Sequence, residues 1–122
     1  MTVSPNRPLL IAAGLCGALG VALSAVAAHR ADMPNLGTAA NMLLFHAPAF
    51  LALSVLTENW VRRAASFVLF AGLALFAGDL LTRAYFGTRL FPMAAPIGGV
   101  LLMSGWLGIA VSAFFKDDGS GS

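Results

Sequence analysis

Long stretches without any charged residue are the feature of this sequence that most constrains its fold. Four of them divide the chain, at residues 8–28, 33–57, 64–78 and 90–115. A hydrocarbon layer about 30 Å thick is crossed by a helix of roughly 20 apolar residues. Backbone groups in lipid must form hydrogen bonds within their own segment, which apolar runs of this length achieve as helices. The pattern therefore predicts an all-α fold, an integral membrane four-helix bundle.

The limits of the predicted helices follow from the charges and from turn-forming residues. We expect helices over residues 8–28, 38–57, 64–85 and 96–115, with Thr38 as the N-cap of the second. The 122 residues, 59% of them hydrophobic, leave room for four crossings and for no separate soluble domain. A single transmembrane domain over residues 1–118 is predicted, and residues 119–122 have the composition of an appended tail.

The amino-terminal apolar run has a second interpretation. Arg7, the uncharged stretch after it and the small residues before His29 imitate a secretory signal with a cleavage site. The run is longer than the roughly 7 to 15 apolar residues of such a signal. We therefore expect it to be kept as the first transmembrane helix.

The seven basic residues lie singly or as one pair at the ends of apolar runs. This distribution is typical of membrane flanks, so the expected surroundings are a lipid bilayer and no nucleic-acid partner is predicted. Four crossings put both termini on one side. That side carries four basic residues and the other side three: Arg7, Arg62, Arg63 and Lys116 against Arg30, Arg83 and Arg89. Because basic residues favour the cytoplasmic side, cytoplasmic termini are expected.

Small residues recur along the predicted helices at the spacing that lets membrane helices approach closely. Such helices associate through backbone contact and interhelical hydrogen bonds, because lipid removes the hydrophobic driving force between them. The residues expected to pack are Gly17, Gly20, Ser24, Gly78 and Gly108. The same spacing serves contacts within one chain and contacts between copies, so both interpretations stay open.

Four strongly polar side chains lie within the predicted spans, or at their ends away from the termini: His29, His46, Asp79 and Arg83. Asp79 follows the uncharged run 64–78, which rises about 22 Å as a helix, so the carboxylate is expected inside the membrane. An ionised group there needs a partner. Arg83 is at the i+4 position, where a partner on the same helix would be.

Depth along the antiparallel helices suggests that His46 and Asp79 meet. His46 lies about 12 Å from the predicted start of the second helix, and Asp79 about 9 Å from the end of the third. Pro48 removes the N–H that would bond the Leu44 carbonyl, which exposes an acceptor beside His46. We therefore expect a polar pocket in the half of the bundle away from the termini, with His29 at its mouth.

The same residues also fit a purely structural role. In that interpretation His46 bonds a carbonyl, Asp79 and Arg83 orient a helix end, and His29 marks the membrane interface. A metal or haem site is a third interpretation, since imidazole suits both. The sequence has no ligand spacing that supports such a site, so no metal and no cofactor are assigned.

Motifs of the common catalytic classes are absent from the sequence. It has no nucleophile elbow, no phosphate-binding glycine loop, no paired cysteines and no cluster of carboxylates. We therefore expect a non-enzymatic protein, a homo-oligomer or a component of a larger membrane complex. The alternative is a protein that handles protons or small solutes with the His46 and Asp79 pocket.

Four motifs together resemble one family of small membrane proteins. They are GALGVALSAVAAHRA at residues 17–31, NMLLFHAPAFLAL at 41–53, AGDLLTRAYFGTRLFPMAAPIGGVLL at 77–102 and SGWLGIA at 104–110. In this order they resemble the YgdD-type proteins, the domain of unknown function four-two-three. The resemblance covers residues 9–115 and implies a four-helix protein of the bacterial inner membrane. It maps the family pattern onto His29, His46, Pro96, Gly98 and Gly99. Many members carry serine where Asp79 stands, and the family brings no established substrate or reaction.

Overall fold

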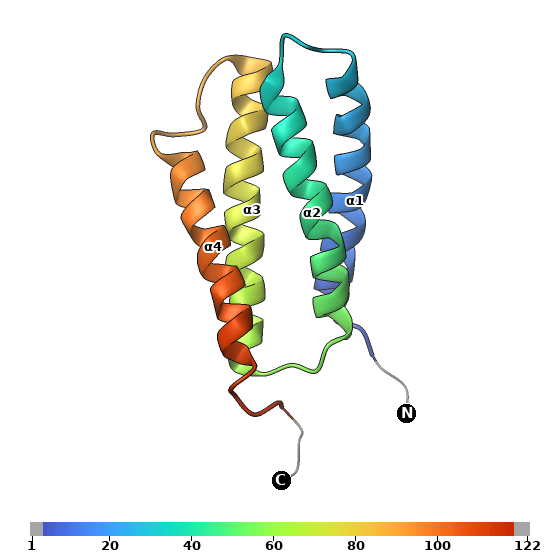
Figure 1. Ribbon diagram of the computed structural model, residues 1–122, viewed down its shortest axis with the longest axis vertical. Helices are drawn as coiled ribbons and strands as arrows, with labels where there is room; N and C mark the ends of the chain where they lie inside the picture. Colours follow the sequence, from blue (N-terminus) through green and yellow to red (C-terminus); the bar gives the residue numbers. More distant parts are fainter. Residues whose placement is uncertain (1–3, 119–122) are drawn as a thin grey trace.

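The computed structural model describes residues 4–118, which form four long helices and no strand. The helices are α1 (Arg7–Ala28), α2 (Pro34–Val55), α3 (Trp60–Phe86) and α4 (Ala94–Ser112) (Figure 1). Each is long and apolar enough to cross a membrane. The prediction of an all-α membrane protein with four spans is therefore confirmed. The predicted tail at residues 119–122 lies outside the described residues.

The helices lie side by side in a row, antiparallel and in the order of the sequence (Figure 1). Within residues 4–118, the helix backbones come close only between neighbours in the chain: α1 and α2, α2 and α3, and α3 and α4. One side-chain contact, from Trp106 of α4 to His46 of α2, joins helices that are not neighbours. Within residues 4–118, the backbone of α1 does not approach that of α3 or α4. The bundle is therefore open, and the helices at its two edges, α1 and α4, each keep a free face.

Both ends of the described chain are fastened near the end of α2, one to its last turn and the other to the connection that follows it. The backbone N–H of Asn6 donates to the Ser54 carbonyl at 2.7 Å, and that of Asp118 donates to the Glu58 carbonyl at 2.6 Å. Residues 4–6 and 116–118 consequently lie at the same end of the row (Figure 1). We call this end the terminal end below.

Capping side chains account for the start of two helices. Asn6 before α1 accepts a hydrogen bond from the Leu9 N–H at 3.2 Å, and Asn59 before α3 accepts one from the Arg62 N–H at 2.7 Å. An asparagine oxygen in this position satisfies an N–H group that the first helical turn leaves unpaired. At the other end of α3, Gly87 has φ +71°, the left-handed conformation that terminates helices.

The start of α2 differs from the prediction. The helix begins at Pro34, so the assignment of Thr38 as the N-cap was wrong. Proline fits the first helical position because its missing N–H would have had no partner there. α2 therefore includes residues 34–37, which the sequence analysis left outside the helix. Pro48 lies within α2, which continues through it as one helix.

The apolar core lies along the seam between α2 and α3. Phe50 of α2 and Leu69 of α3 are fully buried there. α1 contributes mainly small side chains to the same core, among them Ala12, Ala13 and Cys16. Small side chains let the backbones of α1 and α2 come close, which is the usual means of helix association in lipid.

Glycines bring α3 and α4 into backbone contact. A Cβ added at Gly98 would be 2.7 Å from the Phe76 nitrogen, and one added at Gly72 would be 2.8 Å from the Leu102 nitrogen. Real Cβ atoms essentially never come so close to another atom. Only glycine fits at this crossing, and the two helices pack there backbone to backbone.

The small residues of α1 that were expected to pack lie at different distances from α2. An added Cβ at Gly20 would be 2.7 Å from the Leu44 side chain, and one at Gly17 would be 3.8 Å from the Ala47 Cβ. Ser24 is half-buried. α1 therefore lies closest to α2 near Gly20.

The two expected packing residues on the other helices differ from each other. An added Cβ at Gly108 of α4 would be 2.9 Å from the Cβ of Ala65 on α3. Around Gly78 of α3, an added Cβ would meet nothing within 4 Å. Gly108 therefore lies at the α3–α4 crossing, whereas Gly78 adjoins open space.

Candidate functional site

The carboxylate of Asp79 is fully buried in α3. Its Oδ2 is 2.8 Å from Nη2 of Arg83, one turn further along the helix. Its Oδ1 accepts a hydrogen bond from the backbone N–H of Leu90 at 2.7 Å. Leu90 belongs to the connection between α3 and α4, so Asp79 fastens that connection to α3. The structure thus brings two of the four candidate residues together.

The ion pair leaves two buried polar atoms without a hydrogen bond. Within residues 4–118, neither Oδ2 of Asp79 nor Nε of Arg83 has a hydrogen-bond partner. The two groups are close enough for an ion pair, but no N–H of Arg83 is aligned on Oδ2 as a hydrogen bond requires. The carboxylate is therefore held by charge and by the Leu90 bond. Removing either charge would leave the other without compensation.

His46 is buried in α2 and bonds through both ring nitrogens. Its Nδ1 is 2.7 Å from the Met42 carbonyl oxygen, one turn back along the same helix. Its Nε2 accepts a hydrogen bond from the indole N–H of Trp106 at 3.2 Å. A carbonyl can only accept and an indole N–H can only donate, so the two partners together require a neutral ring with its proton on Nδ1.

An aromatic cluster surrounds His46 and links three helices. The ring centroid of His46 is 5.7 Å from that of Trp106 on α4 and 6.3 Å from that of Phe50 on α2. Phe50 in turn lies 6.1 Å from Phe70 on α3. These separations are in the range of favourable aromatic pairs. His46 is therefore a packing element as well as a polar one.

Replacing Trp106 by phenylalanine is expected to lower the free energy of unfolding by about 1 to 2 kcal/mol, because a buried acceptor on His46 loses its donor. The midpoint of thermal unfolding in detergent measures the loss. Trp60→Phe is the matched control, since the Trp60 indole N–H has no hydrogen bond within residues 4–118 and its side chain is exposed. Equal losses in both variants would contradict the assigned role of the Trp106 bond.

The structure does not join His46 to Asp79. No hydrogen bond connects them within residues 4–118, where each has other partners. Because α2 begins at Pro34, His46 is 12 residues into its helix (46 − 34), a rise of about 18 Å. Asp79 is 7 residues from the end of α3 (86 − 79), about 10 Å. The two groups therefore lie at different depths. His29 is exposed at the C-cap of α1.

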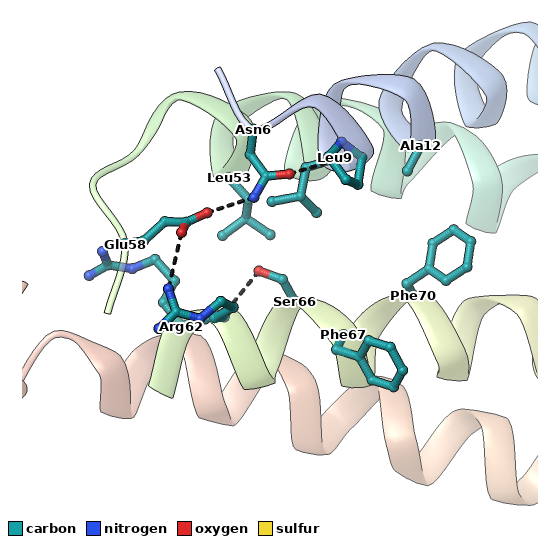
Figure 2. Close-up of a pocket in the computed structure, with 11 residues that line it drawn as sticks. Asn6, Leu9, Ala12, Leu53, Glu58, Arg62, Ser66, Phe67 and Phe70 are labelled. Atoms are coloured by element: carbon teal, nitrogen blue, oxygen red, sulfur yellow. Dashed lines mark hydrogen bonds and ion pairs between the residues drawn. The ribbon is translucent and has the colours of Figure 1, made fainter. Parts of the chain in front are cut away.

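A groove opens between α1 and α3 at the terminal end of the bundle (Figure 2). Its volume is about 340 Å³. The walls are mostly apolar, with Leu9 and Ala12 from α1, Leu53 from α2, and Phe67 and Phe70 from α3. The groove could not be predicted from the sequence, because it depends on α1 and α3 both packing on α2 while their backbones stay apart.

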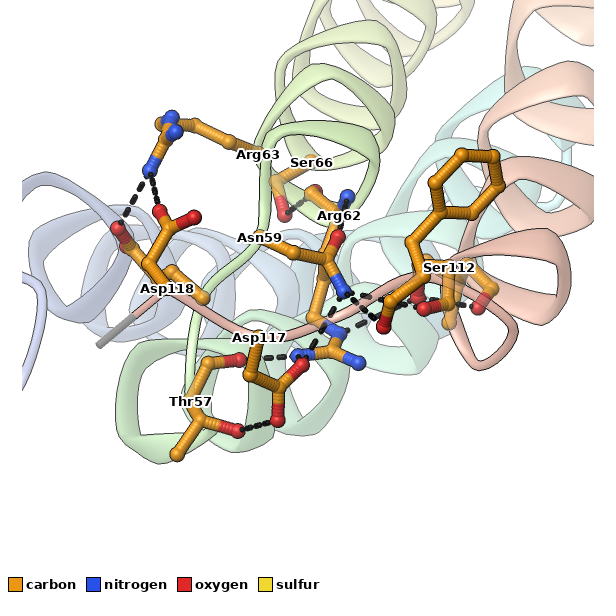
Figure 3. Close-up of polar contacts among 11 residues, drawn as sticks. Thr57, Asn59, Arg62, Arg63, Ser66, Ser112, Asp117 and Asp118 are labelled. Atoms are coloured by element: carbon orange, nitrogen blue, oxygen red, sulfur yellow. Dashed lines mark hydrogen bonds and ion pairs between the residues drawn. The ribbon is translucent and has the colours of Figure 1, made fainter. Parts of the chain in front are cut away.

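A polar network at the terminal end ties α3 to α4 (Figure 3). Asn59 is fully buried, and its amide nitrogen donates to the Ser112 carbonyl at 3.0 Å and to Oδ1 of Asp117 at 3.2 Å. Nε of Arg62 donates to the Ser112 hydroxyl at 3.2 Å. The Thr57 hydroxyl donates to Asp117, which holds the pKa of that carboxyl below its usual value. The start of α3 and the end of α4 are thereby fixed to each other.

This network was missed by the sequence analysis, although one signal for it was present. Asparagine directly before an apolar run is a helix-start signal, and Asn59 precedes the first residue of α3, Trp60. The prediction placed the helix start after the arginine pair instead. Arg62 was consequently assigned to a connection, whereas it lies in the first turn of the helix.

The chain matches the family described as "Protein of unknown function (DUF423)" over residues 8–99. The chain belongs to this family. It is 32% identical to a UPF0382 membrane protein of Haemophilus influenzae, over 89% of this chain and 94% of the relative. It is also 32% identical to the UPF0382 inner membrane protein YgdD of Escherichia coli K12, over 88% and 90%. A UPF0382 membrane protein of Schizosaccharomyces pombe is 32% identical over 77% and 91%. No solved structure matches the chain.

The membership confirms the resemblance stated from the motifs. Two of the residues on which that resemblance depended make contacts between helices. His46 accepts the hydrogen bond from Trp106, and Gly98 packs against the backbone of α3. An added Cβ at the neighbouring Gly99 would meet nothing within 4 Å. Pro96 is the third residue of α4. In this DUF423 chain, His46 and Gly98 of the motifs thus take part in helix packing.

Metal-ligating residue types do not gather in the described part of the chain. Within residues 4–118, no three or more His, Cys, Asp or Glu side chains are arranged to hold a metal ion. His29 is exposed at the end of α1, and His46 already bonds through both nitrogens. Asp79 has partners of its own on α3 and the following connection.

Proposed function

We propose that this DUF423 protein is a non-enzymatic membrane component that associates with a second copy of itself through the outward face of α1. The observation that carries the proposal is a stripe of small, exposed residues on that face: Gly14, Ala18 and Ala22. Residues four apart lie on the same side of a helix. Nothing in the chain lies within 4 Å of a Cβ added at Gly14. A second helix can approach such a stripe closely.

The open arrangement of the bundle supports this proposal. α1 is an edge helix, and only 22% of its apolar span is buried within the chain, against 44% for α3. The buried side of α1 carries Cys16 and Gly20, and the stripe is on the opposite side. α1 therefore has the largest free surface for a further helix.

The bonding of the buried polar groups supports a non-enzymatic role. His46 is engaged by Met42 and Trp106, and Asp79 by Arg83 and Leu90. These bonds fix helices and connections in place. The alternative proposal, proton or solute handling by His46 and Asp79, would require both residues to exchange their present partners.

The proposed location is the bacterial inner membrane with cytoplasmic termini. Support comes from the name of the Escherichia coli relative, an inner membrane protein. The orientation rests on the excess of one basic residue at the terminal end, four against three.

Disulfide cross-linking in native membranes tests the proposal. In a Cys16→Ala background, Ala18→Cys on the stripe is expected to form a covalent dimer on oxidation. Ala110→Cys, exposed on α4, is the matched control and should stay monomeric. Adding Gly14→Leu should suppress the Ala18 cross-link, because a large side chain keeps two backbones apart.

Two results would contradict self-association through α1. One is an absence of cross-linked dimer at position 18 together with a monomeric mass in mild detergent. The other is equal cross-linking with and without Gly14→Leu. A cross-link from position 18 to a different chain, lost with Gly14→Leu, would instead favour a component of a larger complex.

A further inference from the structure

The groove between α1 and α3 combines an apolar interior with a polar mouth (Figure 2). Phe67 and Phe70, on its open side, are 76% and 48% exposed, so the groove faces outward between the two helices. Its volume of about 340 Å³ is within the range of small-molecule sites, about 300 to 1,000 Å³, which are mostly apolar with a few placed polar groups. In a protein that spans the membrane, a groove open to the side meets lipid.

The mouth of the groove carries both signs of charge. Asn6, Glu58, Arg62, Arg63 and Ser66 line it. The amide nitrogen of Asn6 donates to Oε1 of Glu58 at 2.6 Å, and Nη1 of Arg63 is 3.1 Å from the other Glu58 oxygen. These contacts hold the Glu58 carboxylate beside the guanidinium of Arg63.

Arg63 keeps free donors at this mouth. Its Nη1 is engaged by Glu58 and, at 3.0 Å, by Asp118 (Figure 3). Within residues 4–118, its Nε and Nη2 have no hydrogen-bond partner, and the side chain is 53% exposed. Nε and Nη2 form one edge of the planar guanidinium, which binds two phosphate oxygens at once. The free edge is therefore suited to a phosphate.

The depth of these residues matches the layers of a bilayer. α3 has 27 residues and is about 40 Å long, longer than a hydrocarbon core of about 30 Å. Arg63 is in its first turn, at the level of lipid headgroups. Phe67 and Phe70 lie one and two turns deeper, at the level of acyl chains. The polar mouth of the groove therefore lies at the depth of phospholipid headgroups, and its apolar interior lies at the depth of acyl chains.

The polar mouth has to supply the specificity for a lipid. An acyl chain gains little by leaving other acyl chains for an apolar groove, because both surroundings are equally apolar. Of the charged residues that line the mouth, Arg62 and Arg63 are basic and Glu58 is acidic. Arg62 pairs with Asp117, and Arg63 pairs with two carboxylates, Glu58 and Asp118. Two carboxylates on one guanidinium disfavour a headgroup with net negative charge at Arg63. A zwitterionic headgroup can put its phosphate on Arg63 and its ammonium beside Glu58 and Asp118.

We infer that the groove binds one zwitterionic phospholipid, with an acyl chain between α1 and α3 and the phosphate on the free edge of Arg63. The site is separate from the stripe proposed for self-association. Ala12 of the groove lies on the buried side of α1, and Gly14 on its outward side. A result that excludes lipid binding in the groove would therefore leave self-association through the stripe untouched, and the reverse holds as well.

Native mass spectrometry of the whole protein from mild detergent tests the inference, with phosphatidylethanolamine and phosphatidylglycerol as probes. The wild-type chain should bind one phosphatidylethanolamine per copy and prefer it to phosphatidylglycerol. Arg63→Gln should weaken this binding about tenfold, which corresponds to about 1.4 kcal/mol. Arg89→Gln, exposed in the connection between α3 and α4, is the matched control and should bind as the wild type.

A second variant fills the groove. Ala12→Phe should abolish binding of the phospholipid while the helical circular dichroism is kept. If Ala12→Phe does not fold, Arg63→Gln decides alone, since Arg63 is exposed. Unchanged binding in Arg63→Gln, or a preference for phosphatidylglycerol, would overturn the inference. Cross-linking of a Phe67→Cys variant to a second copy would also overturn it, because another chain would then occupy the groove.

Discussion

Replacing Gly98 by alanine is expected to lower the free energy of unfolding by about 2 kcal/mol or more, as overpacking in a tight contact does. The added Cβ would be 2.7 Å from the Phe76 nitrogen and 2.9 Å from the Gly72 carbonyl oxygen. Both are backbone atoms, so no side-chain rotation can make room. α3 and α4 would have to separate. The midpoint of thermal unfolding in detergent, followed by circular dichroism, measures the effect.

Gly99→Ala is the matched control for this experiment. Gly99 is the next residue of α4, and nothing lies within 4 Å of its added Cβ. Alanine is a better helix former than glycine by about 1 kcal/mol, so this variant should be neutral or more stable. A loss of stability in Gly99→Ala as large as in Gly98→Ala would contradict this explanation, because Gly99 has no close contact for an added Cβ to disturb.

Asp79→Ala is expected to cost about 3 kcal/mol, near the lower end for a broken buried ion pair, because Arg83 is partly exposed. Two groups lose their partner together: the Arg83 guanidinium and the backbone N–H of Leu90. The connection between α3 and α4 should loosen. Thermal unfolding reports the loss, and hydrogen exchange at Leu90 reports where it occurs.

Two further variants separate the contributions of charge and hydrogen bond. Asp79→Asn keeps an oxygen for the Leu90 N–H and loses the charge, so its stability should lie between those of wild type and Asp79→Ala. Removing both charges, as Asp79→Leu with Arg83→Leu, should recover part of the loss. If Asp79→Ala unfolds like the wild type and Leu90 exchanges no faster, the carboxylate does not hold the connection.

The number and type of the helices could be predicted from the sequence because a lipid environment restricts the structures that an apolar run can adopt. Charge-free runs of sufficient length have only one common outcome in a membrane. The proximity of Asp79 and Arg83 was also accessible, since an i,i+4 spacing on one helix requires no knowledge of the tertiary structure.

The position of His46 relative to other helices could not be predicted from the sequence. It depends on where α2 begins, and Pro34 has two common uses, in a turn or as the first residue of a helix. The prediction chose the turn, and an error of four residues shifts depth by about 6 Å. The Trp106 partner depends in addition on how α2 and α4 face each other across α3. No local pattern encodes that arrangement.

The row of helices has a consequence for any passage of solutes. The edge helices α1 and α4 do not meet, so the row formed by residues 4–118 is not closed and has no lumen of its own. A water-filled conduit needs walls on every side, so one copy of this chain could supply only a single wall. Any permeation pathway would have to be enclosed jointly with another chain, and permeation would then depend on assembly.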